Sequence, residues 1–156
     1  MATVDIPFLP PVHHVEPEPV TISLAGPPQG KGRARAFLRG GHISHYTPEK
    51  TRTYEGMIRT AAMEAMGPRH PFDQPIEIVL RAVCEIPASW SAKKRQRALT
   101  GELKPTGRPD LDNVAKAFTD ALNGVVYRDD ALIVRATLEK RYGPAPLVVA
   151  TVRVVA

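Results

Sequence analysis

Cysteine is almost absent from this sequence. Cys84 is the single thiol among 156 residues, so no internal disulfide forms, which fits a reducing cytoplasm. There is no apolar run of about 18 residues and no signal peptide of the usual form, so we expect neither a membrane span nor export. No glycine-rich loop follows a predicted strand, which argues against a nucleotide-binding α/β domain. A chain of this length suits one domain with a real core.

Lysine and arginine are missing from residues 1–30, where three acidic residues give a charge of −3. The whole chain carries +5, with a pI of about 9.6, so the remainder carries +8. A basic remainder suggests a polyanionic partner. Residues 1–18 are also rich in proline, which blocks regular hydrogen-bonded ladders. We therefore expect an N-terminal arm at residues 1–18 and a folded domain at residues 19–156.

The most informative stretch is residues 107–133, which read GRPDLDNVAKAFTDALNGVVYRDDALI. Apolar residues at helical spacing predict a short amphipathic helix that ends at the Asn-Gly pair. We expect the helix to start near Asp112 or Asn113, either of which could cap it. In an extended lead-in, Asp110 and Asp112 would point to the same side, near the positive end of the helix dipole.

Two more carboxylates, Asp129 and Asp130, precede a predicted strand at residues 131–141. This strand is expected to carry Asp130 back toward the helix start. Mg²⁺ prefers oxygen ligands and usually keeps several waters, so two or three carboxylates and a substrate phosphate satisfy it. We therefore predict that Asp110, Asp112 and Asp130 hold Mg²⁺, and the sequence leaves open whether Mn²⁺ substitutes.

A structural interpretation of the same residues stays open. An Asp before a helix is often only a cap, and Asp112, Lys116 and Asp120 have the spacing of a surface ion-pair lane. Such pairs contribute only about 0.2–0.5 kcal/mol each. The fuller pattern D-L-D-N-x-x-K followed by D-D is much more specific than an isolated Asp-x-Asp pair.

A basic stretch lies nearer the N-terminus. Every second residue from 31 to 39 is basic or aromatic: Lys31, Arg33, Arg35, Phe37 and Arg39. This alternation predicts a strand whose charged face contacts nucleic-acid phosphates. The alternative is an exposed strand that its charge keeps soluble. The pair Gly40-Gly41 predicts a hairpin turn into residues 42–46.

The remaining elements are predicted from periodicity and from turn residues. Alternation or a nearly all-apolar run predicts strands at residues 20–24, 76–84, 131–141 and 147–155. Thr47-Pro48 predicts a capped helix start, and Gly67 its end. Ser89 or Ser91 is expected to cap a basic helix at residues 92–99. We therefore expect an α+β fold in one compact domain, with a mixed β-sheet and about three packed helices.

The stretch DLDNVAKAFTDALNGVVYRDD resembles the signature of the RusA family of Holliday junction resolvases, found in bacteria and their phages. In that family the pattern D-x-D-N-x-x-K, a helix ending near Leu-Asn-Gly and a D-D pair carry the active site. The resemblance covers about residue 19 to the end of the chain, with looser agreement over residues 20–35. It implies a RusA-like, homodimeric nuclease domain.

The resemblance also implies roles for individual residues. It implies four catalytic residues, the last three of which bind metal: Lys116, Asp110, Asp112 and Asp130. Asn113 matches the family asparagine beside the site, and Asp129 matches the partner acid. Lys31, Arg33 and Arg35 match the basic stretch near the start of the family, which we expect to bind DNA.

These features predict an Mg²⁺-dependent endonuclease that resolves four-way DNA junctions by paired phosphodiester hydrolysis, in recombination and repair. Two opposed cuts need two sites, so we expect a homodimer, encoded by a bacterium or phage and acting in the cytoplasm. One alternative is a non-catalytic DNA-binding module, which would leave the acidic cluster unexplained. The other is a metal-dependent Asp-x-Asp glycosyltransferase, which would normally need the nucleotide-binding domain that the sequence lacks.

Overall fold

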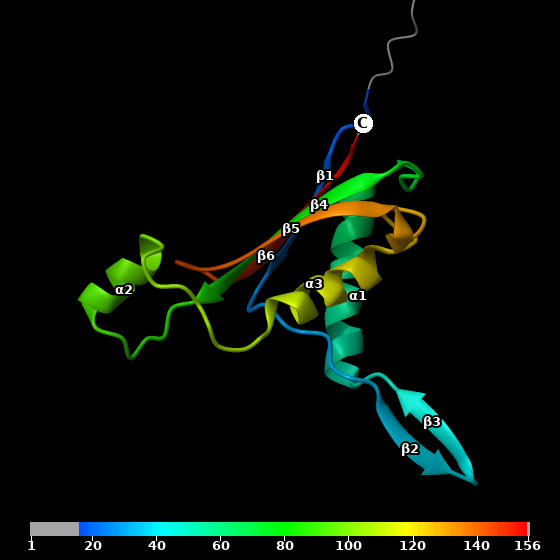
Figure 1. The fold of residues 1–156 in the computed structure, drawn as a ribbon, viewed down its shortest axis with the longest axis horizontal. Helices are drawn as coiled ribbons and strands as arrows, with labels where there is room; N and C mark the ends of the chain where they lie inside the picture. The colour runs from blue at the N-terminus through cyan, green and yellow to red at the C-terminus, as the bar shows by residue number, and fades with distance from the viewer. Residues whose placement is uncertain (1–15, 156) are drawn as a thin grey trace, which may run out of the picture.

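The computed structural model describes residues 16–155 and has an α+β architecture (Figure 1). A four-stranded mixed sheet has the order β1-β6-β4-β5. Its strands are β1 (Val20–Ala25), β4 (Ile76–Glu85), β5 (Ile133–Gly143) and β6 (Leu147–Val154). The predicted fold class and mixed sheet are confirmed, whereas residues 1–15 of the predicted arm lie outside the described residues.

Strand β6 lies inside the sheet, between β1 and β4, and is antiparallel to both. An interior strand is paired along both of its edges. Val148, Ala150 and Val152 are fully buried on the core face, and Leu147, Val149 and Thr151 are partly buried on the other face. Strands β4 and β5 are parallel neighbours, so the chain must cross over between them. That crossover contains helices α2 (Ala92–Leu99) and α3 (Leu111–Leu122).

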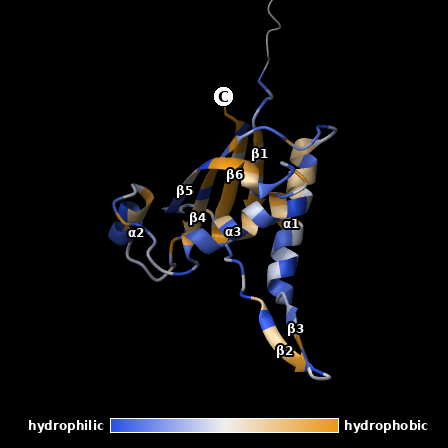
Figure 2. Ribbon diagram, turned by 45° about the vertical axis from the view of Figure 1, so that its right-hand side comes forward, coloured by the Kyte–Doolittle hydropathy of each residue, from blue (hydrophilic) through white to orange (hydrophobic). Residues whose placement is uncertain are grey.

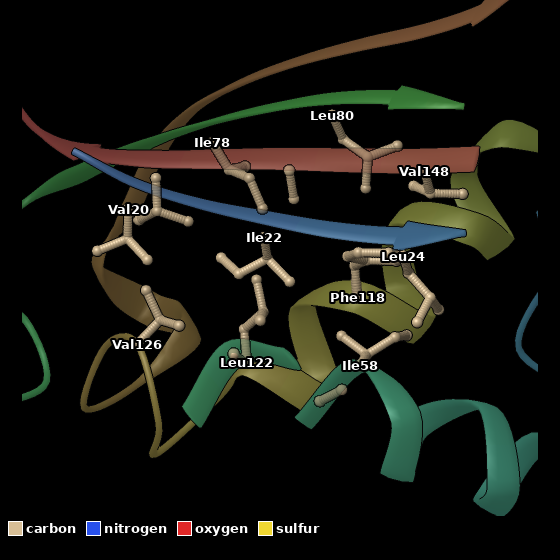
Figure 3. Packing of buried hydrophobic residues seen from close by; sticks show 14 of the residues in the cluster. Val20, Ile22, Leu24, Ile58, Ile78, Leu80, Phe118, Leu122, Val126 and Val148 are labelled. Carbon is tan, nitrogen blue, oxygen red and sulfur yellow. The ribbon is translucent and has the colours of Figure 1, made fainter. Parts of the chain in front are cut away.

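Helices α1 (Glu49–Met66) and α3 cover one face of the sheet (Figures 1 and 3). Helix α2 lies apart from this layer, contacts β5 and buries only Ala98 among its own residues. The three expected helices are therefore present, and two of them form the packed layer. No helix within residues 16–155 combines the length and the apolar character that a membrane span requires.

The hydrophobic core fills the space between the sheet and these two helices (Figure 3). Phe118 and Leu122 of α3 and Ile58 of α1 point toward Ile22 and Leu80 of the sheet. None of these five side chains is more than 1% exposed. The apolar stripe predicted for the helix at residues 111–122 is thus the face that anchors it on the sheet.

The outer face of β4 carries a buried charge. Glu77 is only 5% exposed, although alternation places it opposite the core. Its carboxylate accepts from Arg153 on β6 at 2.5 Å and lies 3.8 Å from Arg135 on β5. The two guanidinium groups exclude water from Glu77 and supply the charge partners that a buried carboxylate requires.

Strands β2 (Arg35–Arg39) and β3 (His42–Tyr46) form a separate antiparallel hairpin that projects from the domain (Figure 1). Gly40 and Gly41 both have positive φ angles, 57° and 80°, as a two-residue primed turn requires. The predicted turn is confirmed. Figure 2 shows apolar residues on this hairpin as well as on the sheet.

The predicted start of the basic strand is wrong. Residues 31–34 precede β2 because their backbone groups bond elsewhere. The N–H of Lys31 donates to Asn113 O at 3.0 Å, and that of Gly32 donates to Thr51 Oγ1 at 3.0 Å. These donors are therefore unavailable to a strand ladder.

Several element boundaries also differ from the predictions. Helix α1 has Pro48 at its N-cap and no side-chain capping bond, so the predicted Thr47 cap is wrong. Strand β5 begins at Ile133, after a short 3₁₀ turn, η1 (Asp130–Leu132). The Ser91 cap is confirmed, because its hydroxyl accepts from the Lys94 N–H at 3.3 Å.

We predict that Phe118→Ala lowers the free energy of unfolding by about 3–5 kcal/mol, because it opens a cavity against the sheet. The control Leu99→Ala removes a side chain that is 48% exposed and should change stability by about 0.5 kcal/mol or less. Urea unfolding of both variants measures the difference. Equal stabilities would show that α3 does not anchor the core.

Candidate active site and DNA groove

The start of α3 presents two exposed carboxylates. Asp110 occupies the N-cap with extended backbone angles (φ −68°, ψ 137°), yet its side chain makes no capping hydrogen bond. Asp112 lies in the first helical turn, so the predicted cap at Asp112 or Asn113 is wrong, and so is the extended geometry assumed for this pair. Both acids still lie where the helix dipole favours negative charge. A carboxylate that does not cap the helix keeps its oxygens available to another partner.

Lys116 lies one turn beyond Asp112 and is held by Asp120. Its ammonium is 2.7 Å from Asp120 Oδ1, so the ion-pair interpretation is confirmed for this part of the lane. Asp120 also accepts a hydrogen bond from Lys31. Burial alone would raise the pKa of Asp120, but the hydrogen bonds from both lysines outweigh it and lower the pKa. The carboxylate is therefore ionised and fixes the position of Lys116.

Lys31 joins this network to α1. Its ammonium lies 3.1 Å from Glu55 Oε1 and also bonds Asp120 on α3. Burial alone would lower the pKa of Lys31, but hydrogen bonds and charge from Asp120 and Glu55 leave it raised. Lys31 is consequently a charged tether between two helices, with its donors largely used inside the protein.

Two glycines let the tethered segment approach the helices closely. A Cβ on Gly32 would lie 2.6 Å from Thr51 Oγ1, and one on Gly30 would lie 3.1 Å from Asn113 Cβ. Thr51 is buried and accepts the Gly32 N–H bond. Larger residues at position 32 would therefore push the basic segment away from α1.

This close approach forms a groove of about 880 Å³ at the start of α3. The groove brings basic residues from three parts of the chain around a single carboxylate, Asp110: Lys31, Arg33, Arg35, Lys50 and Arg108. Asn113 also lines it. The sequence did not predict Lys50 as a groove residue, because a lysine in the first turn of a helix is usually a solvated surface residue. The groove is a positively charged surface that contains one acidic group, Asp110.

Asp129 and Asp130 have different environments. The Asp129 carboxylate accepts from the Ala131 N–H at 2.8 Å and so caps the turn η1. Asp130 begins that turn and is exposed. Burial raises the pKa of nearby Tyr127, and the charges of Asp130 and Asp120 raise it further. Tyr127 donates to Thr119 O at 2.8 Å, which ties the segment before Asp130 to α3.

The structure brings the predicted ligands together only in part. Asp110 and Asp112 share the start of α3, whereas Asp130 lies in η1 at the start of β5. Across residues 16–155, no three His, Cys, Asp or Glu side chains form a group that could hold a metal ion. Within the same residues, Asp110, Asp112 and Asp130 make no ion pair. Their exposed carboxylate oxygens suit a hard ion, which needs one or two protein carboxylates beside a substrate phosphate.

The sequence matches the family described as Endodeoxyribonuclease RusA over residues 25–153. The chain belongs to this family. The matched region takes in the basic segment, the groove, the start of α3 and η1. The family comprises Holliday junction resolvases, so this RusA-family protein is an endodeoxyribonuclease that hydrolyses DNA phosphodiesters. RusA-family nucleases bind junction DNA and are generally dependent on a divalent metal.

A relative aligns with most of this chain. The uncharacterized protein YqaN of Bacillus subtilis (strain 168) is 30% identical over 136 residues. The alignment covers 86% of this chain and 95% of that protein. The RusA-family match at residues 25–153 likewise extends over most of the described chain rather than over one motif.

We predict that Asp120→Asn lowers the free energy of unfolding at neutral pH by about 1–3 kcal/mol, because both lysines lose a charged acceptor. A lowered pKa means that this stabilisation is present above the ordinary value of 3.8 and is lost as the pH falls through the folded-state value. The difference between wild type and variant should therefore shrink in acid.

Urea unfolding at falling pH measures this effect. The control Glu102→Gln breaks an exposed ion pair with Arg97 and should leave stability unchanged. A difference for Asp120→Asn that stays constant down to strongly acidic pH would contradict the assigned ion pairs.

Proposed function

We propose that this protein resolves four-way DNA junctions in an Mg²⁺-dependent reaction centred on the start of α3. The observation that carries the proposal is a basic groove whose lining includes Asp110, the N-cap residue of α3, whose carboxylate makes no capping bond. Basic walls attract a phosphate backbone, whereas a lone carboxylate among them would repel it. A cation between the carboxylate and the phosphate resolves this conflict.

Asp110, Asp112 and Asp130 would hold the cation. Bound Mg²⁺ supplies Lewis acidity toward a phosphate oxygen and lowers the pKa of a nearby attacking water. Asp130 would contribute from η1, whose position depends on the Asp129 cap and on the Tyr127 bond to α3. Asp129 is thus a positioning residue in this proposal.

Lys116 would stabilise charge on the reacting phosphate. Its side chain is 55% exposed, and Asp120 orients its ammonium from the next turn of α3. A cation fixed one turn from Asp112 is suited to neutralise negative charge that develops on the phosphate or on the leaving oxygen. Asn113 would position the groove wall, since its carbonyl accepts the Lys31 N–H.

Arg33 and Arg35 would supply most of the contact between the basic segment and DNA. Both are exposed and line the groove. Lys31 lines it too, but Glu55 and Asp120 already neutralise its charge. Lys31 would then support DNA binding mainly by holding the segment in place.

Paired cleavage would require a symmetric dimer. Resolution of a junction needs a cut on each of two opposed strands, and each copy carries one start of α3. Two-fold pairing is the commonest symmetry of homo-oligomers and would place two sites in opposed orientation. Junctions arise on chromosomal or phage DNA, so the proposed place of action is the bacterial cytoplasm.

We predict that Asp112→Asn slows Mg²⁺-dependent cleavage of a synthetic four-way junction by about a hundredfold or more, because it removes a ligand charge. Junction binding should be unchanged or tighter, since one negative charge is removed from the start of α3, beside the groove. Gel assays with Mg²⁺ and with EDTA measure both properties. The control Asp73→Asn changes an exposed acid in the link between α1 and β4 and should cleave like wild type.

Two outcomes would contradict the proposal. Parallel loss of binding and cleavage in Asp112→Asn would assign Asp112 a structural role. Wild-type protein that binds junctions yet cuts none with any divalent metal would leave only a DNA-binding module.

We also predict that Arg33→Ala and Arg35→Ala weaken DNA binding evenly across sequences. Each variant should reduce the slope of log affinity against log salt concentration by about 1, the value for one lost phosphate contact. Arg59→Ala, on α1 and outside the groove, is the matched control. An unchanged slope in both groove variants would show that the basic segment does not touch phosphates.

A further inference from the structure

The β2–β3 hairpin has two chemically different faces. The strand register places Leu38 directly opposite Ile43, next to the turn. These side chains are 73% and 69% exposed, although their cross-strand pairing joins them into one apolar patch. Arg39 and His42 form the pair beside them on the other face of the hairpin.

The basic face of the hairpin is braced by aromatic packing. Phe37 and Tyr46 meet edge to face, with ring centroids 5.9 Å apart. Arg35 and Arg39 lie on either side of Phe37 on the same face of β2. The hairpin therefore holds a defined shape while it projects from the domain (Figure 1).

The positive charge of residues 19–48 indicates what kind of partner would cover the apolar patch of Leu38 and Ile43. Residues 19–48 contain no Asp or Glu, and their charged residues are all basic: Lys31, Arg33, Arg35 and Arg39. A second copy of the hairpin would bring like charges together. A polyanion matches the charge, and only a partner that also offers an apolar surface would cover Leu38 and Ile43.

We propose that the hairpin tip is a junction probe, which places Leu38 and Ile43 against base pairs at the branch point of four-way DNA. This inference rests on the proposed function and names the element that recognises junction structure. Base pairs at a branch point can be unstacked at lower cost than those within a continuous duplex, so their flat apolar faces become accessible. Apolar side chains that wedge between base steps, flanked by arginines, are a known mode of DNA recognition.

The position of the hairpin supports this role. Arg35 lines the groove and is also the first residue of β2. A DNA arm held in the groove therefore continues along the hairpin toward its tip. Arg35 and Arg39 would contact phosphates of any DNA, whereas Leu38 and Ile43 discriminate in favour of a branch.

The double variant Leu38→Thr/Ile43→Thr tests the proposal, because threonine keeps strand propensity and removes most of the apolar surface. Binding is measured in EDTA on a four-way junction and on a linear duplex of the same sequence. We expect about tenfold weaker binding to the junction, from two lost apolar contacts, and unchanged binding to the duplex. The control Met63→Gln removes an exposed apolar side chain on α1 and should change neither affinity.

Two further measurements keep the test decisive. A 2-aminopurine base at the branch point should brighten when wild-type protein unstacks it and should stay dim with the double variant. Sedimentation should give the same oligomeric state for both proteins. The single variants Leu38→Thr and Ile43→Thr should each show part of the effect if the double variant folds poorly.

Equal loss of affinity for junction and duplex would overturn the proposal, as would no loss at all. Dissociation of a wild-type oligomer by the double variant would also overturn it, since the patch would then join two copies. Wild-type protein without any preference for junctions would instead defeat the proposed function itself. Full resolvase activity with an unchanged preference in the double variant would defeat only the hairpin proposal.

Discussion

The Lys31 ammonium connects segments that are distant in sequence, and the groove depends on it. It forms an ion pair with Glu55 on α1 and a hydrogen bond to Asp120 on α3. The backbone N–H of Lys31 donates to Asn113 O near the start of α3. Asp120 also holds Lys116. Partly buried, mutually bonded charges contribute more than isolated surface pairs, because each is desolvated and already oriented. The basic segment and the face of α3 that carries Lys116 therefore form one unit.

Much of the fold could be predicted from local pattern. The strand and helix periods identified β1, β4, β6 and α3, and the apolar sequence of β6 indicated its interior position. The Gly40-Gly41 turn followed from the need for positive φ. These features depend on residues close together in sequence, so their physical causes are visible there.

Features that depend on distant partners could not be predicted. Strand β2 starts at Arg35 because Asn113 and Thr51 take the preceding N–H groups. Glu77 is buried because Arg153 and Arg135 lie on the adjacent strands. Both outcomes require the tertiary arrangement, which periodicity does not encode.

The candidate site also combines features that the sequence predicted with features that only the fold determines. The motif identified the acids and Lys116 by type and spacing, but not their different uses. Asp129 caps η1 while Asp130 does not, a difference set by local backbone geometry. Likewise, the alternation of basic residues predicted the same DNA-binding role for Lys31 and Arg33. In the structure the Lys31 ammonium forms ion pairs with Glu55 and Asp120 inside the protein. Residue type therefore predicts which acidic and basic groups the site contains, whereas the fold decides which of them are engaged in contacts within the protein.

The interior position of β6 affects the order in which the protein can be assembled. Within the sheet, β1 pairs with β6 alone. Although β1 is synthesised early, it can therefore pair fully only after the ribosome has translated β6, which ends at Val154. Contacts between segments so far apart in the chain close slowly, because the intervening loop must first lose entropy. Helix α3, which presents Asp110 and Asp112 at its start, rests on that sheet through Phe118 and Leu122. A nascent chain can therefore carry every acidic residue of the site and still lack the platform that positions them.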